Sequence, residues 1–219
     1  MSDTCLEKFR SIDTGFISDA MSALGIDGWL NGLHPANEEH TICGRAFTIQ
    51  FSDDMETYPA SYNIFELLEK AEPGDVIILS ANSSGSACGE KVMHAVEQLG
   101  LQAIVTDGPT RDHRVLDKMD TPIFSAGVTN RVRTGTFVPR AYQIPVRCAG
   151  IFIKPGDVII GDVDGVIAIP SEQADAVLSQ SEWVKQMEEQ MEEVISECYS
   201  AEKLKLLSKM KKQLRQASE

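Results

Sequence analysis

The hexapeptide Asp107-Gly108-Pro109-Thr110-Arg111-Asp112 places a fixed cation beside a carboxylate that can bind a metal ion. It follows a strand-like run at residues 101–105. In α/β proteins, loops that leave the carboxyl ends of strands carry ligands. Adjacent Arg and Asp side chains can bind a substrate carboxylate and a hard divalent cation side by side. The alternative is an exposed loop salt bridge, which contributes little stability.

A β-α-β unit is predicted around this loop. Residues 89–99 have the length and apolar spacing of a helix, which Gly100 closes, and the strand at 101–105 follows. Small polar residues at 80–86 precede the helix, so backbone N–H groups at its start can approach an anion closely. The helix start and the Arg111-Asp112 loop then share one sheet edge. A 2-oxo acid can chelate Mg²⁺ or Mn²⁺ there, with Asp112 as the metal ligand.

The rest of the chain interleaves strands and helices. We expect a helix at 14–24 with Thr14 as N-cap, a strand at 43–51 and a short helix at 62–70. The phrase Pro-Gly-Asp-Val-Ile-Ile occurs at 73–78 and again at 155–160, each time as a turn that feeds a strand. Further strands are expected at 122–125, 151–153, 158–160 and 166–169, with a weaker one at 144–146 because it contains proline. Residues 161–165 favour a tight hairpin over a calcium loop.

After Pro170 the chain changes character, and residues 171–217 have the pattern of one long helix or two helices. Glutamates come early in this tail and lysines late, which matches the helix dipole and favours a solvated face over a partner site. We therefore expect a catalytic domain at 1–170 and a charged helical extension at 171–219.

Composition narrows the function classes. A net charge of −13 argues against a broad nucleic-acid surface, which needs clustered Lys and Arg. No apolar run is long enough to cross a bilayer, and the start lacks a signal pattern, so we expect a soluble cytoplasmic protein. Five scattered cysteines without a C-x-x-C pair favour reduced thiols over disulfides or zinc ligands. A small molecule or another protein is the expected partner.

Several short motifs together resemble the class II 4-hydroxy-4-methyl-2-oxoglutarate aldolases, which share their fold with the regulators of ribonuclease E activity (RraA). The motifs are Ser18-Asp19-Ala20, Pro73-Gly74-Asp75-Val76, Gly89-Glu90, Asp107-Gly108 with Arg111-Asp112, Ala126-Gly127, Pro155-Gly156-Asp157, Gly161-Asp162 and Asp164-Gly165-Val166. Glu90 stands at the family's spacing, twenty residues before Arg111-Asp112, where relatives often carry Asp. The resemblance covers roughly residues 14–170.

This resemblance implies an α/β fold, a layered α/β/β/α sandwich of the swivelling β/β/α type, assembled as a homotrimer or homohexamer. It also implies cleavage of a 4-hydroxy-2-oxo acid to pyruvate and a second oxo acid, with oxaloacetate decarboxylation as a companion activity. Asp112 would hold the divalent metal, Arg111 would bind the carboxylate and steady the enolate, and Glu90 would be catalytic. The substrate-binding residues would be Gly89, Glu90, Lys91, Val92 and Arg111. Glu188 or Glu189 of a neighbouring subunit would enter the site.

Other interpretations stay open. A non-catalytic regulator that binds a ribonuclease is the main alternative, and Asp112 argues against it because a regulator needs no metal ligand. His94 and His113 are weaker candidates for a phosphate carrier. Arg131 and Arg133 fit either the distal carboxylate of a substrate or a subunit interface.

Overall fold

A computed structural model describes residues 3–197 and 199–216 of the chain. These residues form two compact units. One comprises Gly28–Ser171, and the other comprises the described residues of Met1–Asp27 and Glu172–Glu219. No helix within the described residues is long and apolar enough to span a membrane. The predicted division at residue 170 assigns catalysis to residues 1–170 and an extension to residues 171–219. This assignment of roles stays a prediction.

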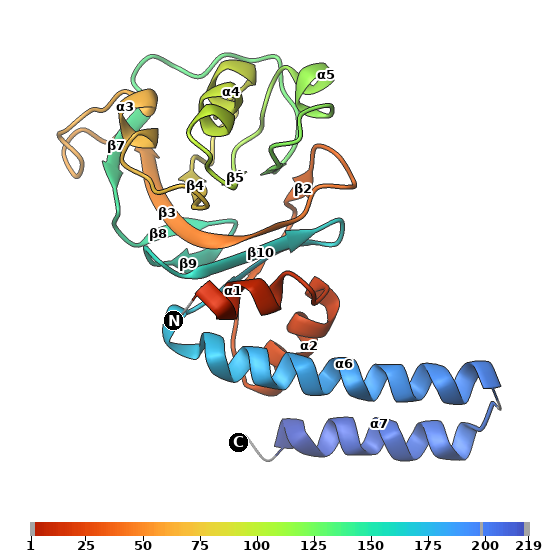
Figure 1. The fold of residues 1–219 in the computed structure, drawn as a ribbon. Helices are drawn as coiled ribbons and strands as arrows, with labels where there is room; N and C mark the ends of the chain where they lie inside the picture. The colour runs from red at the N-terminus through yellow and green to blue at the C-terminus, as the bar shows by residue number, and fades with distance from the viewer. Residues whose placement is uncertain (1–2, 198, 217–219) are drawn as a thin grey trace. The chain divides into compact units, whose positions relative to one another are not determined.

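A large mixed sheet forms the frame of the Gly28–Ser171 unit (Figure 1). Four neighbouring strands run parallel: β3 (Ile42–Ser52), β4 (Val76–Ser80), β5 (Ala103–Thr106) and β6 (Ile123–Ser125). Antiparallel strands extend the sheet: β1 (Trp29–Leu30), β2 (His34–Pro35), β7 (Val138–Tyr142), β10 (Val158–Asp162) and β11 (Gly165–Ile169). Among the described residues, β8 (Val146–Cys148) and β9 (Ile151–Ile153) make a separate antiparallel pair.

Strand β3 has two different partners along one edge. Its first half pairs with β10, where Arg45 lies opposite Val158, and its second half pairs with β7, where Ile49 lies opposite Tyr142. The other edge pairs with β4. Because successive side chains of a strand point to opposite faces, the eleven residues of β3 contribute to both sides of the sheet.

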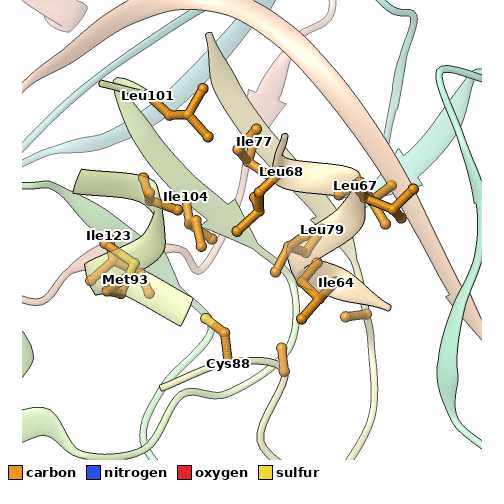
Figure 2. Packing of buried hydrophobic residues seen from close by; sticks show 14 of the residues in the cluster. Ile64, Leu67, Leu68, Ile77, Leu79, Cys88, Met93, Leu101, Ile104 and Ile123 are labelled. Carbon is orange, nitrogen blue, oxygen red and sulfur yellow. The ribbon is translucent and has the colours of Figure 1, made fainter. Parts of the chain in front are cut away.

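Alternate side chains of β4 face two apolar clusters, one on each side of the sheet. Ile77 and Leu79 face one apolar cluster, which holds residues of α3 (Ile64–Leu68) and α4 (Glu90–Gln98), whereas Val76 and Ile78 face a second cluster with residues of β8 and β9. Figure 2 shows the first cluster, where Leu67, Leu68 and Met93 pack toward the strands. Full burial of each such side chain stabilises the fold by about 1.5–3 kcal/mol. The helix, sheet and small-sheet layers are those of the predicted α/β fold class.

The predicted β-α-β unit is present as β4, α4 and β5. Helix α4 ends in a left-handed glycine, Gly100, with φ 65°, and the Leu101 N–H donates to the Val96 carbonyl at 3.0 Å. Leu101 therefore belongs to the helix cap, and the strand starts later than predicted, at Ala103. Both copies of the Pro-Gly-Asp turn also form, with φ 90° at Gly74 and 83° at Gly156.

Other predictions are confirmed or corrected by particular residues. The hairpin at 161–165 is confirmed, since Asp162 pairs with Gly165 between β10 and β11. Thr14 is not an N-cap: it begins α2 (Thr14–Ala23), and the extended residue Asp13 caps it without a side-chain hydrogen bond. Strand β7 was not predicted, because Pro139 interrupts it. It is an edge strand, which tolerates proline.

The second unit is helical. It contains α1 (Asp3–Phe9), α2, the short 3₁₀ turn Ser171–Gln173, α6 (Ala174–Glu197) and α7 (Ala201–Gln216). Helices α6 and α7 lie side by side, so the tail forms two helices (Figure 1). Lys8 forms an ion pair with Glu182 at 3.3 Å, and the Lys185 ammonium donates to the Ser11 carbonyl at 3.1 Å.

Four cysteines, Cys5, Cys43, Cys88 and Cys148, are buried and free, and the reduced state of their thiols stays a prediction. Cys198 lies outside the described residues.

Candidate functional site

The start of α4 and the loop after β5 meet at the carboxyl edge of the parallel strands. The Glu90 N–H donates to the Asp112 Oδ2 at 3.2 Å, and the Arg111 N–H donates to the Cys88 carbonyl at 3.3 Å. Asp112 also lies 3.6 Å from the Arg111 Nε. The prediction from the sequence that these two segments lie close together is therefore correct.

The meeting point of the α4 start and the loop after β5 is called the junction below. Gly89 is required there because its neighbours lie too close for any side chain. Its φ of −162° is ordinary extended backbone. A Cβ at this position would lie 2.6 Å from the Asp112 Oδ2 and 2.9 Å from the Arg111 Cγ. The missing side chain thus provides the space in which the carboxylate and the guanidinium lie against the helix start. Among the described residues, no acceptor contacts the N–H groups of Gly89 and Lys91, so both can donate to a ligand.

Asp112 adopts a left-handed backbone with φ 64° and ψ 30°. It caps α5 (His113–Leu116) through its carbonyl, which accepts from the Val115 N–H at 2.8 Å. Asp and Asn visit this region more readily than most residues. This conformation directs the carboxylate back toward α4 while the next helix begins. No feature of the sequence predicted it.

The first four residues of the hexapeptide build the loop that carries Arg111 and Asp112. Asp107 accepts the Ala81 N–H at 2.7 Å with Oδ1 and the Ala149 N–H at 3.3 Å with Oδ2, and so joins the ends of β4 and β5 to the β8–β9 turn. Burial raises the pKa of Asp107, and these N–H donors oppose the rise. A Cβ at Gly108 would lie 2.4 Å from the Ala81 carbonyl oxygen, so only glycine fits.

The remaining predicted site residues are near the junction with different orientations. The Glu90 carboxylate points along its own helix, 3.7 Å from the His94 Nε2, and only its backbone N–H contacts Asp112. The Lys91 side chain is exposed. Val92 packs against the apolar core and its N–H donates to the Gly89 carbonyl at 3.1 Å, so neither group is open to a ligand. His113 begins α5 directly after Asp112.

A cavity of about 650 Å³ lies at the same edge of the sheet. Residues that end four parallel strands or follow them line it: Phe51, Ser80, Asp107 and Ala126. This is the usual ligand position in α/β sheets. Arg111 and Asp112 lie outside its lining, and their side chains are 48% and 38% exposed. The ion pair is therefore open to solvent in the single chain.

The side chains near Asp112 limit what metal site can form. No group of three or more His, Cys, Asp or Glu side chains within the described residues could hold a metal ion. Asp112 supplies one hard oxygen ligand. Mg²⁺ fits such a site better than zinc or calcium does, because it keeps several waters and takes oxygens from the substrate.

Residues 14–168 match the RraA-like family, which is described as Aldolase/RraA. The chain belongs to the RraA-like family. A provisionally named 4-hydroxy-4-methyl-2-oxoglutarate aldolase of Halalkalibacterium halodurans is 33% identical over 196 residues, which cover 88% of this chain and 89% of that protein.

Two crystal structures resemble this RraA-like chain closely. An uncharacterized protein of Pseudomonas syringae has a TM-score of 0.83 at 27% identity, with 94% of this chain and 98% of that chain covered. Streptomyces coelicolor RraAS2, a member of the RNase ES inhibitor RraA family, has a TM-score of 0.75 at 24% identity and covers 86% of this chain and 96% of its own. The first match extends over nearly the whole RraA-like chain, and the second supports the fold alone.

Proposed function

We propose that this RraA-like protein is a divalent-metal-dependent aldolase that cleaves a 4-hydroxy-2-oxo acid to pyruvate and a second oxo acid. Decarboxylation of oxaloacetate is the proposed companion activity. The observation that carries the proposal is the Asp112 carboxylate, which lies beside the Arg111 guanidinium and within hydrogen-bonding distance of the α4 start. The similarity to the provisionally named aldolase of Halalkalibacterium halodurans supports the reaction class.

Asp112 would hold Mg²⁺ or Mn²⁺, with the oxygens of the substrate and water as the other ligands. A divalent cation bound there supplies a Lewis acid that polarises the 2-oxo group. The exposure of Asp112 leaves room for these ligands, and Gly89 leaves its carboxylate unobstructed.

The protein's own groups then bind the substrate and stabilise the charge that develops. The open N–H groups of Gly89 and Lys91 donate to the substrate carboxylate, helped by the positive end of the α4 dipole. In retro-aldol cleavage water takes the proton of the 4-hydroxyl, C4 becomes the carbonyl of the second oxo acid, and the electrons of the C3–C4 bond form the C2–C3 double bond of an enolate with its charge on the 2-oxo oxygen. A proton from water then adds to C3 and gives pyruvate. The Arg111 guanidinium stabilises the resulting enolate, where fixed positive charge has its largest effect. Oxaloacetate gives the same pyruvate enolate when it loses carbon dioxide.

A neighbouring subunit would complete this site. An enolate needs protection from water, yet Arg111 and Asp112 are both well exposed in the single chain. A homotrimer or homohexamer would cover them, and Glu188 or Glu189 of a neighbour is the proposed acid that enters the site. Both glutamates belong to α6.

The test measures oxaloacetate decarboxylation and cleavage of 4-hydroxy-4-methyl-2-oxoglutarate after treatment with EDTA and then with Mg²⁺ or Mn²⁺. We expect activity to return with metal in the wild type. We expect kcat/KM to fall at least about 100-fold in Asp112→Asn, which tolerates the left-handed backbone. Asp120→Asn is the matched control, because Asp120 is exposed and eight residues away.

An inactive wild type with every metal would overturn the aldolase proposal. The ribonuclease regulator would then be the better explanation, and inhibition of a purified ribonuclease by both the wild type and Asp112→Asn would support it.

A further inference from the structure

A second, smaller cavity of about 220 Å³ shares Asn82 and Phe137 with the larger one. One wall is the polar loop after β4, residues 82–85, and the other is the segment at residues 131–134. Asp53 and Phe137 complete the lining. This volume suits a small ionic group rather than a cofactor.

Two arginines give this cavity a positive charge on a chain whose net charge is −13. The Arg133 Nη1 donates to the Ala87 carbonyl at 3.3 Å, and its guanidinium lies 5.6 Å from the centre of the Phe51 ring. Arg133 is thereby fixed in place. The Arg131 guanidinium contacts no acceptor on the described residues. Asp53 supplies the single carboxylate of the lining, so the cavity keeps an excess positive charge.

Backbone hydrogen bonds connect both walls to the segments that carry the proposed catalytic groups. The Ser86 N–H donates to the Arg131 carbonyl at 2.9 Å, and the Thr129 N–H donates to the Thr110 carbonyl at 2.8 Å. The wall at Gly85 is four residues from Gly89, a separation of at most about 14 Å in a fully extended chain. An arginine side chain and a five-carbon acid together can span such a gap.

We propose that Arg131 binds the second carboxylate of a dicarboxylic 2-oxo acid, and that it selects this class over monocarboxylic 2-oxo acids. The inference rests on the proposed function, because it places the first carboxylate at Arg111 and the α4 start. Arg131 is a specificity residue that contacts no reacting atom. Arg133 is a positioning residue that holds the wall.

The charge of Arg131 explains why selectivity should be large. A guanidinium and a carboxylate form hydrogen bonds about twice as strong as neutral ones, and often two at once. When an acid without the second carboxylate binds, Arg131 stays in water as it does in the free protein. Arg131 then adds nothing to the affinity for that acid. We therefore expect a difference of at least about tenfold between the two classes.

The test compares two ligands of equal chain length by isothermal titration calorimetry in the presence of Mg²⁺. 2-Oxoglutarate has a distal carboxylate, and 2-oxopentanoate has a methyl group there. Neither can undergo retro-aldol cleavage, since both lack a 4-hydroxyl group. Neither loses carbon dioxide as oxaloacetate does, since no carboxylate lies β to the oxo group. Binding is thus read without turnover.

We expect the wild type to bind 2-oxoglutarate at least about tenfold more tightly than 2-oxopentanoate. Arg131→Met should bring this ratio to within about threefold without weakening 2-oxopentanoate, and Arg131→Lys should give an intermediate ratio. Arg114→Met is the matched control, because Arg114 is an exposed arginine of α5 outside the cavity lining. It should keep the wild-type ratio.

Three results would overturn the inference, and they are distinguishable. Equal binding of both ligands by the wild type, or an unchanged ratio in Arg131→Met, excludes Arg131 as the selective residue and leaves the aldolase proposal standing. Failure of the wild type to bind either 2-oxo acid overturns both proposals.

Discussion

Replacement of Gly89 by alanine tests the geometry of the junction with a single methyl group. That methyl would lie 2.6 Å from the Asp112 Oδ2, 2.9 Å from the Arg111 Cγ and 3.3 Å from the Arg111 Nε. Real Cβ atoms essentially never approach other atoms within 3.0 Å. The carboxylate and the guanidinium must therefore both move away from the start of α4.

The size of the effect follows from these contacts. Moving the Asp112 carboxylate out of contact requires a shift of several tenths of an ångström or more, which breaks its 3.2 Å hydrogen bond from the Glu90 N–H. A misplacement of about 1 Å in a catalytic group can cost roughly 100-fold in rate. The backbone at Gly89 is extended, so alanine adds no conformational strain, and both displaced side chains are partly exposed. We expect kcat/KM to fall about 100-fold while the melting temperature changes by less than about 3 °C.

The assay combines Mg²⁺-dependent oxaloacetate decarboxylation with a thermal melt of the same preparation. Gly15→Ala is the control, since a Cβ at Gly15 has nothing within 4 Å and lies in α2. It should keep full activity. If Gly89→Ala retained kcat/KM within about twofold, the position of Asp112 against α4 would not matter for catalysis, and our reasoning about this junction would be wrong.

Three further predictions concern Arg140, Asp107 and Cys88. Arg140→Met removes a buried guanidinium that donates to three backbone carbonyls, so we expect a loss of at least about 3 kcal/mol in the free energy of unfolding, measured with urea. Burial raises the pKa of Asp107, so the folded state binds a proton more tightly than the unfolded state does. The stability of the wild type relative to Asp107→Asn should therefore decrease as the pH rises from about 4 through the raised pKa, and urea unfolding at several pH values tests this. Burial also raises the pKa of Cys88 to about 12. Iodoacetamide at pH 8 should therefore alkylate Cys88 at least about 100-fold more slowly in the folded protein than in urea. Peptide mass spectrometry measures both rates.

Sequence patterns predicted those parts of the fold that depend on local chemistry. The Pro-Gly-Asp turns, the helix at Gly89 and the hairpin at Asp162 each have their own signal in neighbouring residues, and all three are present. The approach of Asp112 to the α4 start followed from the topology of a β-α-β unit, in which both loops reach one edge of the sheet.

Features that depend on distant residues could not be predicted. The left-handed backbone of Asp112 and the two hydrogen bonds to Asp107 arise from packing of loops that are far apart in the sequence. The Glu90 carboxylate is a different case: its contact with His94 is local, four residues along the same helix, but it depends on the side-chain rotamer and not on the spacing to Arg111. The arginines at 131 and 133 suggested an anion, but only their position across from residues 82–85 showed a cavity.

The double pairing of β3 has a consequence for synthesis on the ribosome. Arg45 of β3 pairs with Val158, a residue that is translated more than a hundred residues later. At about 5–20 residues per second, that interval lasts roughly 5–20 s. Until then the nascent chain exposes an edge of β3. Strand β7 can cover the half with Phe51 once residues 138–142 are made, whereas the half with Ile42 stays open until β10 follows. Aggregation of ribosome-bound or truncated chains is therefore most to be expected before residue 158 emerges, and chaperone demand should fall once β10 has paired.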